Sequence, residues 1–552
     1  MTITTAKPAF AVGTALLAAL LILLLGNRIK PNLREGITLL ASVVMAGTVF
    51  SMAPGVAEGN VYVSKLWTVV DGIELSFRTD AAGMVFACIA SCLWILTSVY
   101  SIGYMRGHHE KNQTGYFAAF AACLASAVGI AFAANLITFF IFYEMLTLAT
   151  YPLVAHYRDD KAKASGRKYL AYTLVSGQLF FAGIVWVYAR YGTLDFAAGG
   201  FIPAGSVSPG LMCVMFFMMI LGGAVKAGVM PLHGWLPSAM VAPTPVSALL
   251  HAVAVVKAGA FCVLRVVLYV FGPESAEWCG GAEILSWFAL ATILLSSLVA
   301  MRQDNLKARL AFSTIGQLSY IVLGISLLSS YSITGAVFHI SAHAFLKITL
   351  FMAAGAIFVN TGLSKISEMG GLYKRMPVTA VCFAAASLGI AGLPLMAGFV
   401  SKFNILEGAL IVGKPFAMVV LIAAALLALA YLMPVVRVFF GRTSAGRTWA
   451  EHSVVSRQNT GQPSGQQSAG RHDTDMADDV KNMGADTEIA AAQHGDHAVD
   501  VRAVAAMVVP LTITVIIGII LGFSPDAGAN LYSMAQMAAE AVTGEGGVYL
   551  AG

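Results

Sequence analysis

Charged residues are scarce in this sequence. Of 552 residues, Lys and Arg contribute 33 and Asp and Glu 28, so only 11% of the chain is charged while 58% is hydrophobic. The mean hydropathy is +0.79, whereas soluble domains carry about 25% charged residues. This composition excludes an ordinary soluble domain. It predicts a polytopic membrane protein of the all-α class that contacts the lipid bilayer, and we expect no nucleic-acid partner.

Cysteine is equally sparse, with seven residues that lie singly or within apolar runs. No spacing typical of a zinc, haem or iron–sulfur site occurs. Cys88 and Cys92, four residues apart in one apolar run, are better explained by helix packing than by ligation. We therefore expect no cofactor and no metal in this chain. Whether the chain is part of an enzyme stays open, because redox chemistry would then belong to another protein of the same complex.

Long apolar runs dominate what is present. A hydrocarbon core of about 30 Å needs roughly 20 apolar residues per helix, and the first run is not followed by a signal-peptide cleavage site. The pattern predicts about 14 transmembrane helices, at residues 9–26, 36–54, 81–104, 114–134, 135–155, 168–191, 210–242, 245–271, 283–301, 308–329, 332–359, 378–412, 416–439 and 504–524.

The charges between these runs alternate. Loops after odd-numbered spans are basic, whereas loops after even-numbered spans are neutral or acidic. An excess of Lys and Arg marks cytoplasmic loops. The alternation therefore predicts that both termini lie on the non-cytoplasmic side.

A polar segment at residues 441–503 interrupts the apolar pattern. It contains four scattered histidines but no cysteine, and the spacing fits no standard metal site. We interpret it as a flexible cytoplasmic insertion. Residues 504–552 are expected to hold the last transmembrane helix and a short tail.

Lys226 lies inside the apolar run 211–242, which has no other charged residue. A straight helix of that length would measure about 48 Å, too long for one crossing, and Pro231 and Pro237 favour a break. A lysine at the bilayer centre costs about 2.5–3.5 kcal/mol, so it needs water or a partner. One alternative is a lysine that snorkels to a nearby surface. The other is a titratable group in an ion path.

Further ionisable residues lie inside the predicted spans. Glu144 shares a polar stripe with Thr147, and a nearby lysine such as Lys226 would keep its carboxylate ionised. His251 and Lys257 are six residues apart and so point to different sides of one helix. For His251, a hydrogen-bonded core role and a relay role remain equally open.

Three groups share one face of the span 332–359. His339, His343 and Lys347 follow at i, i+4 and i+8. Two histidines four apart can ligate a metal, but this span has no third ligand, and a row of groups that pass protons fits better. Lys402 follows a second interrupted run, from 378 to 412. Two interrupted helices, one in each half of the chain, are typical of transporter sites built on internal repeats.

Several of these segments together resemble a known family. FRTDAAGMVF, the Glu144 segment, KAGVMPLHGWLPSAMVAPTPVSALLH, DNLKARLAFSTIGQLSY, HISAHAFLKITLFMAAG and GLPLMAGFVSKFNIL are similar to the antiporter-like membrane subunits of respiratory complex I (NADH:quinone oxidoreductase), Mrp-type cation/proton antiporters and energy-converting membrane hydrogenases. The resemblance covers roughly residues 75–440.

This resemblance implies 14 helices with two inverted five-helix repeats, each with a broken helix. We expect a three-helix segment at 1–110, repeats at 111–272 and 283–440, and the insertion and last helix as above. It implies a proton pathway with Glu144 and Lys226 as a pair, His251 and Lys257 as connecting residues, His339, His343 and Lys347 as the central axis, and Lys402 as the terminal lysine.

The resemblance also implies a setting. We expect other membrane subunits as partners, H⁺ as the ion with Na⁺ as a second candidate, and the inner (plasma) membrane of a prokaryotic cell. Lys257 and Lys402 favour an Mrp D-like component of a cation/proton antiporter. The alternatives are a proton-pumping component of a complex I-like or hydrogenase complex, and a membrane partner of an inorganic-carbon uptake system.

Overall fold

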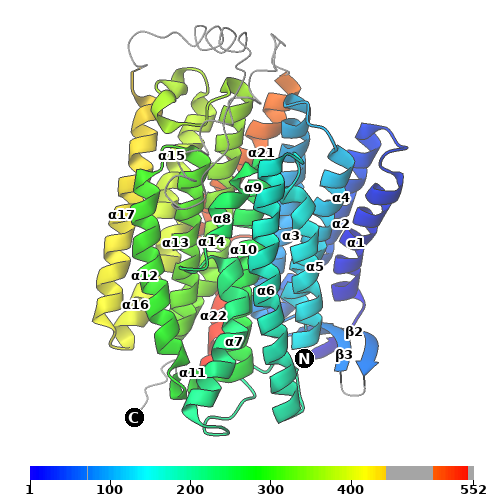
Figure 1. Ribbon diagram of the computed structural model, residues 1–552, viewed down its shortest axis with the longest axis vertical. Helices are drawn as coiled ribbons and strands as arrows, with labels where there is room; N and C mark the ends of the chain where they lie inside the picture. The colour runs from blue at the N-terminus through cyan, green and yellow to red at the C-terminus, as the bar shows by residue number, and fades with distance from the viewer. Residues whose placement is uncertain (71–72, 443–500, 545–552) are drawn as a thin grey trace, which may run out of the picture.

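The computed structural model describes residues 1–70, 73–442 and 501–544. The insertion expected at 441–503 therefore lies almost wholly outside the described residues. Most of the described chain forms helices that run side by side along the long axis of the molecule (Figure 1). Thirteen of the described helices are long and apolar enough to cross a membrane. The broken α15–α16 pair supplies one further crossing, which agrees with the expected fourteen.

The helices and strands follow in this order: β1 (Thr2–Thr4), α1 (Lys7–Leu25), α2 (Pro31–Ala57), β2 (Val61–Val70), β3 (Ile73–Arg78), α3 (Ala81–Gly107), α4 (Gln113–Phe132), α5 (Leu136–Val154), α6 (Asp160–Tyr191), α7 (Pro209–Ala227), α8 (Trp235–Ser238), η1 (Ala239–Val241), α9 (Thr244–Ala252), α10 (Val255–Arg265), the π-helix η2 (Val266–Phe271), α11 (Gly272–Trp278), α12 (Gly281–Arg302), α13 (Leu306–Ser326), α14 (Ser330–Thr361), η3 (Ile366–Glu368), η4 (Leu372–Lys374), α15 (Pro377–Ala391), α16 (Ala397–Ile411), α17 (Pro415–Phe440), α21 (Val501–Phe523) and α22 (Leu531–Thr543).

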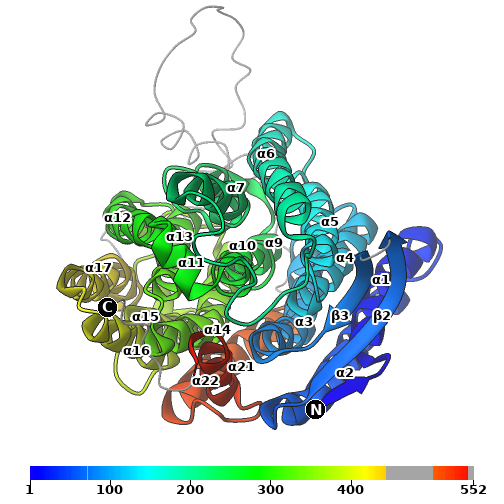
Figure 2. The same cartoon turned by 90° about the horizontal axis from the view of Figure 1, so that it is seen from below.

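Burial separates central from peripheral helices. The apolar windows of α9–α11 and of α13 are 100% buried and that of α14 is 89% buried, whereas α1 is 33% and α17 39% buried. Seen along the bundle, α9, α10 and α14 lie in the middle, with α1 and α2 at one edge and α17 at the opposite edge (Figure 2). Central helices need no lipid-facing apolar surface, and these helices carry most of the predicted site residues.

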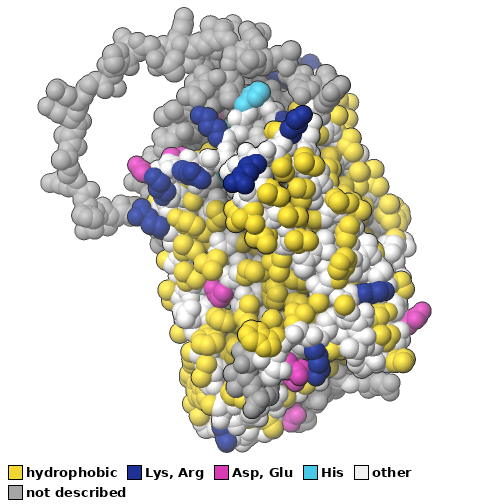
Figure 3. All heavy atoms as spheres, turned by 90° about the vertical axis from the view of Figure 1, so that its right-hand side faces the viewer, with side chains coloured by type: hydrophobic (Ala, Val, Ile, Leu, Met, Phe, Trp, Pro, Cys, Tyr) yellow, Lys and Arg dark blue, Asp and Glu magenta, His cyan; other side chains and the backbone are white. Residues whose placement is uncertain are grey.

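The outer surface shows the distribution of charge expected for a membrane protein. On the face that Figure 3 shows, apolar side chains form a broad band, and Lys and Arg gather at one end of it. This basic end holds the last turn of α3, with Arg106, and the loops that follow α1, α3, α5, α12 and α14, which include Arg28, Lys30, Arg158 and Arg375. Apolar side chains facing outward are favourable only against lipid or another apolar surface.

Both expected interruptions of transmembrane helices are present. α7 ends at Gly228, whose φ of 75° is left-handed, and α15 ends at Gly392 with a φ of 93°. Glycine has no Cβ and adopts this conformation at little cost, so it terminates each helix within the apolar run. Each break leaves backbone carbonyl groups of the preceding helix without helical partners, and a lysine lies beside each break.

Three features differ from the sequence-based expectation. The stretch expected to be one helix at 245–271 breaks between Ala252 and Val255, where no glycine or proline occurs. A three-stranded sheet adds to the helices, with β1 parallel and β3 antiparallel to β2. The expected short tail contains α22, whose buried side chains pack mainly against α14 and α3.

Candidate functional site: a row of buried ionisable groups

Lys226 lies in the last turn of α7 and is fully buried. Its Nζ donates a hydrogen bond to the backbone oxygen of Tyr143 on α5 at 2.7 Å, and lies 3.2 Å from the centroid of the Tyr143 ring. The Tyr143 hydroxyl in turn donates to the backbone oxygen of Gly222, at 2.6 Å. A carbonyl and an aromatic face both attract an ammonium group. The lysine is therefore held by neutral partners that join α5 to α7.

Glu144 follows Tyr143 directly, but its carboxylate does not bind the Lys226 ammonium. Both carboxylate oxygens are buried and have no hydrogen-bond partner within the described part of the chain. The oxygen Oε1 points at Gly177 on α6, where an added Cβ would lie 2.2 Å from it. No Glu144–Lys226 contact within 4.0 Å occurs among the described residues, and the pairing of these two groups stays a prediction. The nearest described partner of the Lys226 ammonium group is instead the backbone oxygen of Tyr143, the residue before Glu144.

Lys226 also lies at a close crossing of α7 and α10. A Cβ at Gly259 would be 2.8 Å from the Gly223 oxygen and 2.4 Å from the Ala227 nitrogen. Both glycines therefore allow the two backbones to approach closely. This crossing sets the α7 lysine against the helix that carries Lys257.

Lys257 reaches across to α14. Its Nζ lies 2.7 Å from Nδ1 of His343, so the ammonium group donates to the imidazole. The break before α10 separates Lys257 from His251, which instead stacks against Phe351 of α14 with ring centroids 4.9 Å apart. Both residues are buried and both face α14. They therefore do not point to different sides of one helix, as the sequence suggested, because the helix ends between them.

The three α14 groups line one face, as their spacing predicts. The rings of His339 and His343 are 6.0 Å apart, and Lys347 continues the row one turn further along. All three are buried, and Lys347 Nζ has no hydrogen-bond partner among the described residues. An ammonium group so placed costs several kcal/mol to keep charged.

Lys402, in the second turn of α16, ends the row. Its Nζ donates to the backbone oxygens of Ile390 and Ala391, at 2.6 and 3.3 Å, and lies 4.8 Å from the Tyr320 ring centroid. These carbonyls terminate α15, where the helix dipole favours a cation. The neighbouring Ser401 shares a hydrogen bond of 2.7 Å with His339. Lys402 is thus joined to the α14 face through its own helix.

The two lysines beside the helix breaks contact the same kinds of group. Each ammonium group binds carbonyl oxygen and an aromatic face, with Tyr143 for Lys226 and Tyr320 for Lys402. Sequence reasoning identified the lysines but not these two tyrosines. An aromatic residue in an apolar helix carries no signal of its own, since such residues are common in membrane spans.

Sequence reasoning also missed an ion pair with a buried arginine, at the end opposite the basic end. Arg265 of α10 is 1% exposed and binds both carboxylate oxygens of Asp80, at 2.5 and 3.0 Å. Asp80 also caps α3 by accepting a hydrogen bond from the Gly83 amide. The signal was available, because Arg265 is a charge within an apolar run. The Arg265–Asp80 ion pair joins α10 to the start of α3 and so helps to hold Lys257 in position.

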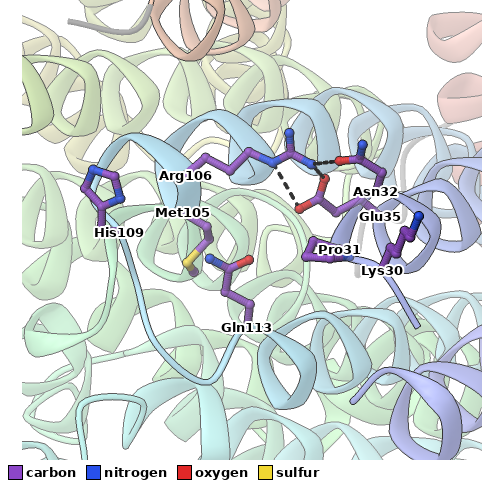
Figure 4. A pocket seen from close by; sticks show the side chains of 8 residues that line it. All are labelled: Lys30, Pro31, Asn32, Glu35, Met105, Arg106, His109 and Gln113. Carbon is purple, nitrogen blue, oxygen red and sulfur yellow. Dashed lines mark hydrogen bonds and ion pairs between the residues drawn. The ribbon is translucent and has the colours of Figure 1, made fainter. Parts of the chain in front are cut away.

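No group of three or more potential metal ligands occurs in the residues that the structure describes. A pocket of about 610 Å³ opens at the basic end, between α2 and the loop after α3 (Figure 4). Its Arg106 binds Glu35 and donates to Asn32 at 2.5 Å. The polar groups of the pocket thus largely form hydrogen bonds with one another. The pocket lies away from the buried row, by which we mean the buried ionisable groups described above, from Glu144 and Lys226 to Lys402.

Comparison with known proteins agrees with this geometry. Residues 133–428, more than half of the chain, match the family described as "NADH:quinone oxidoreductase/Mrp antiporter, TM". The chain belongs to this family. The matched range includes all eight predicted site residues and both broken helices.

Relatives occur in both branches of the family. The chain is 34% identical over 66% of its length to a protein of Rhizobium meliloti named as part of a probable K⁺/H⁺ antiporter, of which the match covers 36%. It is 30% identical over 74% of its length to the N component of the NADH-quinone oxidoreductase of Desulforudis audaxviator, covering 81% of that protein. A component of a Na⁺/H⁺ antiporter of Alkalihalophilus pseudofirmus is 33% identical over 61% of the chain and is 43% covered. The chain thus spans less than half of the two antiporter proteins.

Solved structures share the fold over nearly the whole chain. A chain of the Mrp complex from Dietzia sp. DQ12-45-1b superposes with a TM-score of 0.77 at 22% identity, covering 98% of this chain and 97% of that one. A chain of the membrane-bound sulfane sulfur reductase, an archaeal respiratory membrane complex, gives 0.73 at 21% identity, covering 98% and 100%. The fold expected from the sequence, that of the antiporter-like membrane subunits, is confirmed.

Proposed function

We propose that this chain is a proton-translocating, antiporter-like subunit of a multisubunit membrane complex. The observation that carries the proposal is the contact of 2.7 Å between Lys257 Nζ and His343 Nδ1. It joins the half of the chain that contains Lys226 to the half that contains Lys402. A proton can pass directly between an ammonium group and an imidazole at this distance.

The buried row supports movement of protons over a long lateral distance. Glu144 and Lys226 lie on α5 and α7, Lys257 on α10, the two histidines and Lys347 on α14, and Lys402 on α16. Packing alone does not account for four buried lysines, because each costs free energy to insert. In the proposed cycle, a change in the charge of Glu144 alters the hold on the Lys226 proton. That proton then moves to Lys257, along α14 and on to Lys402.

Two lines of support bear on the complex and its orientation. The relatives are named as subunits, and both structural neighbours are chains of membrane complexes. We infer that this chain works with other membrane proteins, with H⁺ and, as in the relative named a Na⁺/H⁺ antiporter, Na⁺ as candidate ions. The gathering of Lys and Arg at one end supports a cytoplasmic position for the basic end, with both termini on the other side of the plasma membrane.

Lys347 provides the test of this function. The complex is purified from native membranes, reconstituted into vesicles, and assayed for proton uptake with a pH-sensitive dye. Lys347→Met removes a buried base from the row and should lower uptake at least tenfold, because the path then lacks one station. Lys414→Met is the matched control, since that side chain is 52% exposed and lies outside the row. Uptake at the wild-type rate in Lys347→Met would refute the proposal.

A second candidate is a proton-pumping component of a redox complex. The match to the N component of an NADH-quinone oxidoreductase covers 81% of that protein, much more than the share of the antiporter proteins that is covered. The two functions use the same buried row and differ in the driving reaction. Identification of the proteins that purify with this chain separates them. Iron–sulfur or hydrogenase proteins indicate a redox-driven pump, and their absence from an active complex indicates an ion-gradient-driven antiporter.

A further inference from the structure

A second cluster of titratable groups lies at the basic end, outside the row described above. Glu110, in the loop between α3 and α4, has a side chain that is only 6% exposed. His108 of the same loop and His156, which follows α5, flank it with side chains that are 13% and 5% exposed. The loop also borders the pocket of Figure 4, which His109 lines. A nearly buried carboxylate thus lies within a few residues of the solvent-facing surface.

The contacts of this carboxylate come from two separate loops. Oε1 lies 2.9 Å from Nδ1 of His108 and accepts a hydrogen bond of 2.9 Å from the Tyr157 hydroxyl, while Oε2 lies 3.6 Å from Nε2 of His156. Burial by itself would raise the pKa of Glu110, but the hydrogen bonds from His108 and Tyr157 and the close contact with His156 outweigh it and lower the pKa to about 2. The carboxylate is therefore ionised at physiological pH and serves as a fixed negative charge.

Two imidazoles flank the fixed negative charge of Glu110, with ring nitrogens 2.9 Å and 3.6 Å from its carboxylate oxygens. Histidine is the side chain whose ordinary titration range spans pH 5–8. Tyr104 and Tyr116 are the further titratable groups that act on Glu110 from α3 and α4. Neither competes for protons near neutrality, because a phenol ordinarily titrates near pH 10. The two imidazoles are thus the groups in contact with Glu110 whose ring nitrogens can either donate or accept a proton.

The cluster is connected electrostatically to the interior. Lys307, in the first turn of α13, interacts with Glu110 and donates a hydrogen bond of 3.0 Å to the backbone oxygen of Ala242. Ala242 lies just before α9, and His251 lies seven residues into that helix, about 10 Å deeper in the bundle. The His251 ring lies 4.9 Å, between centroids, from the ring of Phe351 on α14, one helical turn from Lys347 on the same helix. The groups therefore follow one another from the basic end to the buried row.

We propose that His108, His156 and Glu110 form a proton-collecting site at the basic end, which supplies the buried row through Lys307 and His251. In this arrangement the histidines exchange protons with solvent, and Glu110 is a positioning residue that holds both rings and concentrates protons at the entrance. One partner for the Glu110 carboxylate would be enough to fix the loop. The carboxylate instead contacts imidazoles from two different loops, and Lys307 lies between it and the interior of the bundle. The proposal rests on the proton transport proposed above and assigns its point of entry.

The experiment compares proton uptake by the reconstituted complex after a pH jump applied to either face. Glu110→Gln should slow uptake from the basic end about tenfold, the lower limit of what a charged entrance gives to ion capture, and leave uptake from the opposite face unchanged. His156→Gln should have the same one-sided effect. Asp160→Asn is the matched control, because this carboxylate lies at the same end but is fully exposed.

A mobile buffer separates proton collection from a purely structural role. Imidazole added at the basic end should restore uptake in Glu110→Gln. The free imidazole can deliver protons to Lys307 when His108 and His156 are no longer held in position by the carboxylate. Equal loss from both faces, or failure of imidazole to restore uptake, would overturn the proposal. Uptake at the wild-type rate in Glu110→Gln would also overturn the proposal. If Lys347→Met is inactive in the same assay, the proposed transport function still stands. Absence of uptake in the wild-type complex would instead contradict the transport function itself.

Discussion

Gly177 is predicted to control transport although it has no side chain. An added Cβ at this position on α6 would lie 2.2 Å from Oε1 of Glu144, where ordinary contact begins at 3.4 Å. Gly177→Ala must therefore displace the carboxylate by about 1 Å while its charge remains. Because a misplacement of about 1 Å can reduce the rate of a reaction about 100-fold, we expect proton uptake to fall by roughly 10- to 100-fold.

The assay is dye-monitored proton uptake by the reconstituted complex, together with thermal unfolding in detergent. The folded state should survive, because the displaced atom ends a flexible side chain. Gly47→Ala in α2 is the matched control, since no atom lies within 4 Å of its added Cβ. Wild-type uptake in Gly177→Ala, combined with inactivity of a variant without the Glu144 carboxylate, would show that the position of this carboxylate does not matter.

Three further outcomes follow from the contacts. Arg265→Met leaves the partly buried Asp80 carboxylate without its partner and should lower the free energy of unfolding by about 3 kcal/mol, measured by denaturant unfolding in detergent; a loss below about 1 kcal/mol contradicts the role of the pair. Lys257→Met removes the bond to His343 and should abolish proton uptake without lowering the melting temperature. Because its pKa is lowered in the folded state, Glu110 contributes stability above pH 4.5, and this contribution is lost as the pH falls toward about 2. The melting temperatures of wild type and Glu110→Gln should therefore differ at about pH 6 and converge as the pH falls from 4.5 toward about 2.

Most of the transmembrane architecture could be predicted from the sequence, because the bilayer requires long apolar runs and the breaks at Gly228 and Gly392 occur at residues that terminate helices. The break after Ala252 could not be predicted. No glycine or proline marks it, and tertiary packing overrides the helical preference of the segment. The sheet and α22 were also missed. A search for apolar runs of about twenty residues does not detect short strands or short amphipathic helices, which are then assigned to loops.

For the candidate site, sequence reasoning could select residues but not their partners. A lysine in an apolar run is conspicuous, and the spacing from His339 to Lys347 places those groups on one face. Contacts between distant helices leave no local trace. The sequence therefore suggested Glu144 and Lys226 as a pair, but it did not show that the backbone oxygen and ring of Tyr143 contact the Lys226 ammonium group.

The most direct test of the account is proton uptake by the reconstituted complex that carries Glu144→Gln. This change removes the charge of a buried carboxylate and keeps its shape, so the variant should assemble and melt like the wild type. The account predicts that uptake falls to the level of protein-free vesicles, because nothing then alters the hold on the Lys226 proton. Uptake at the wild-type rate by a folded, assembled Glu144→Gln complex would contradict it.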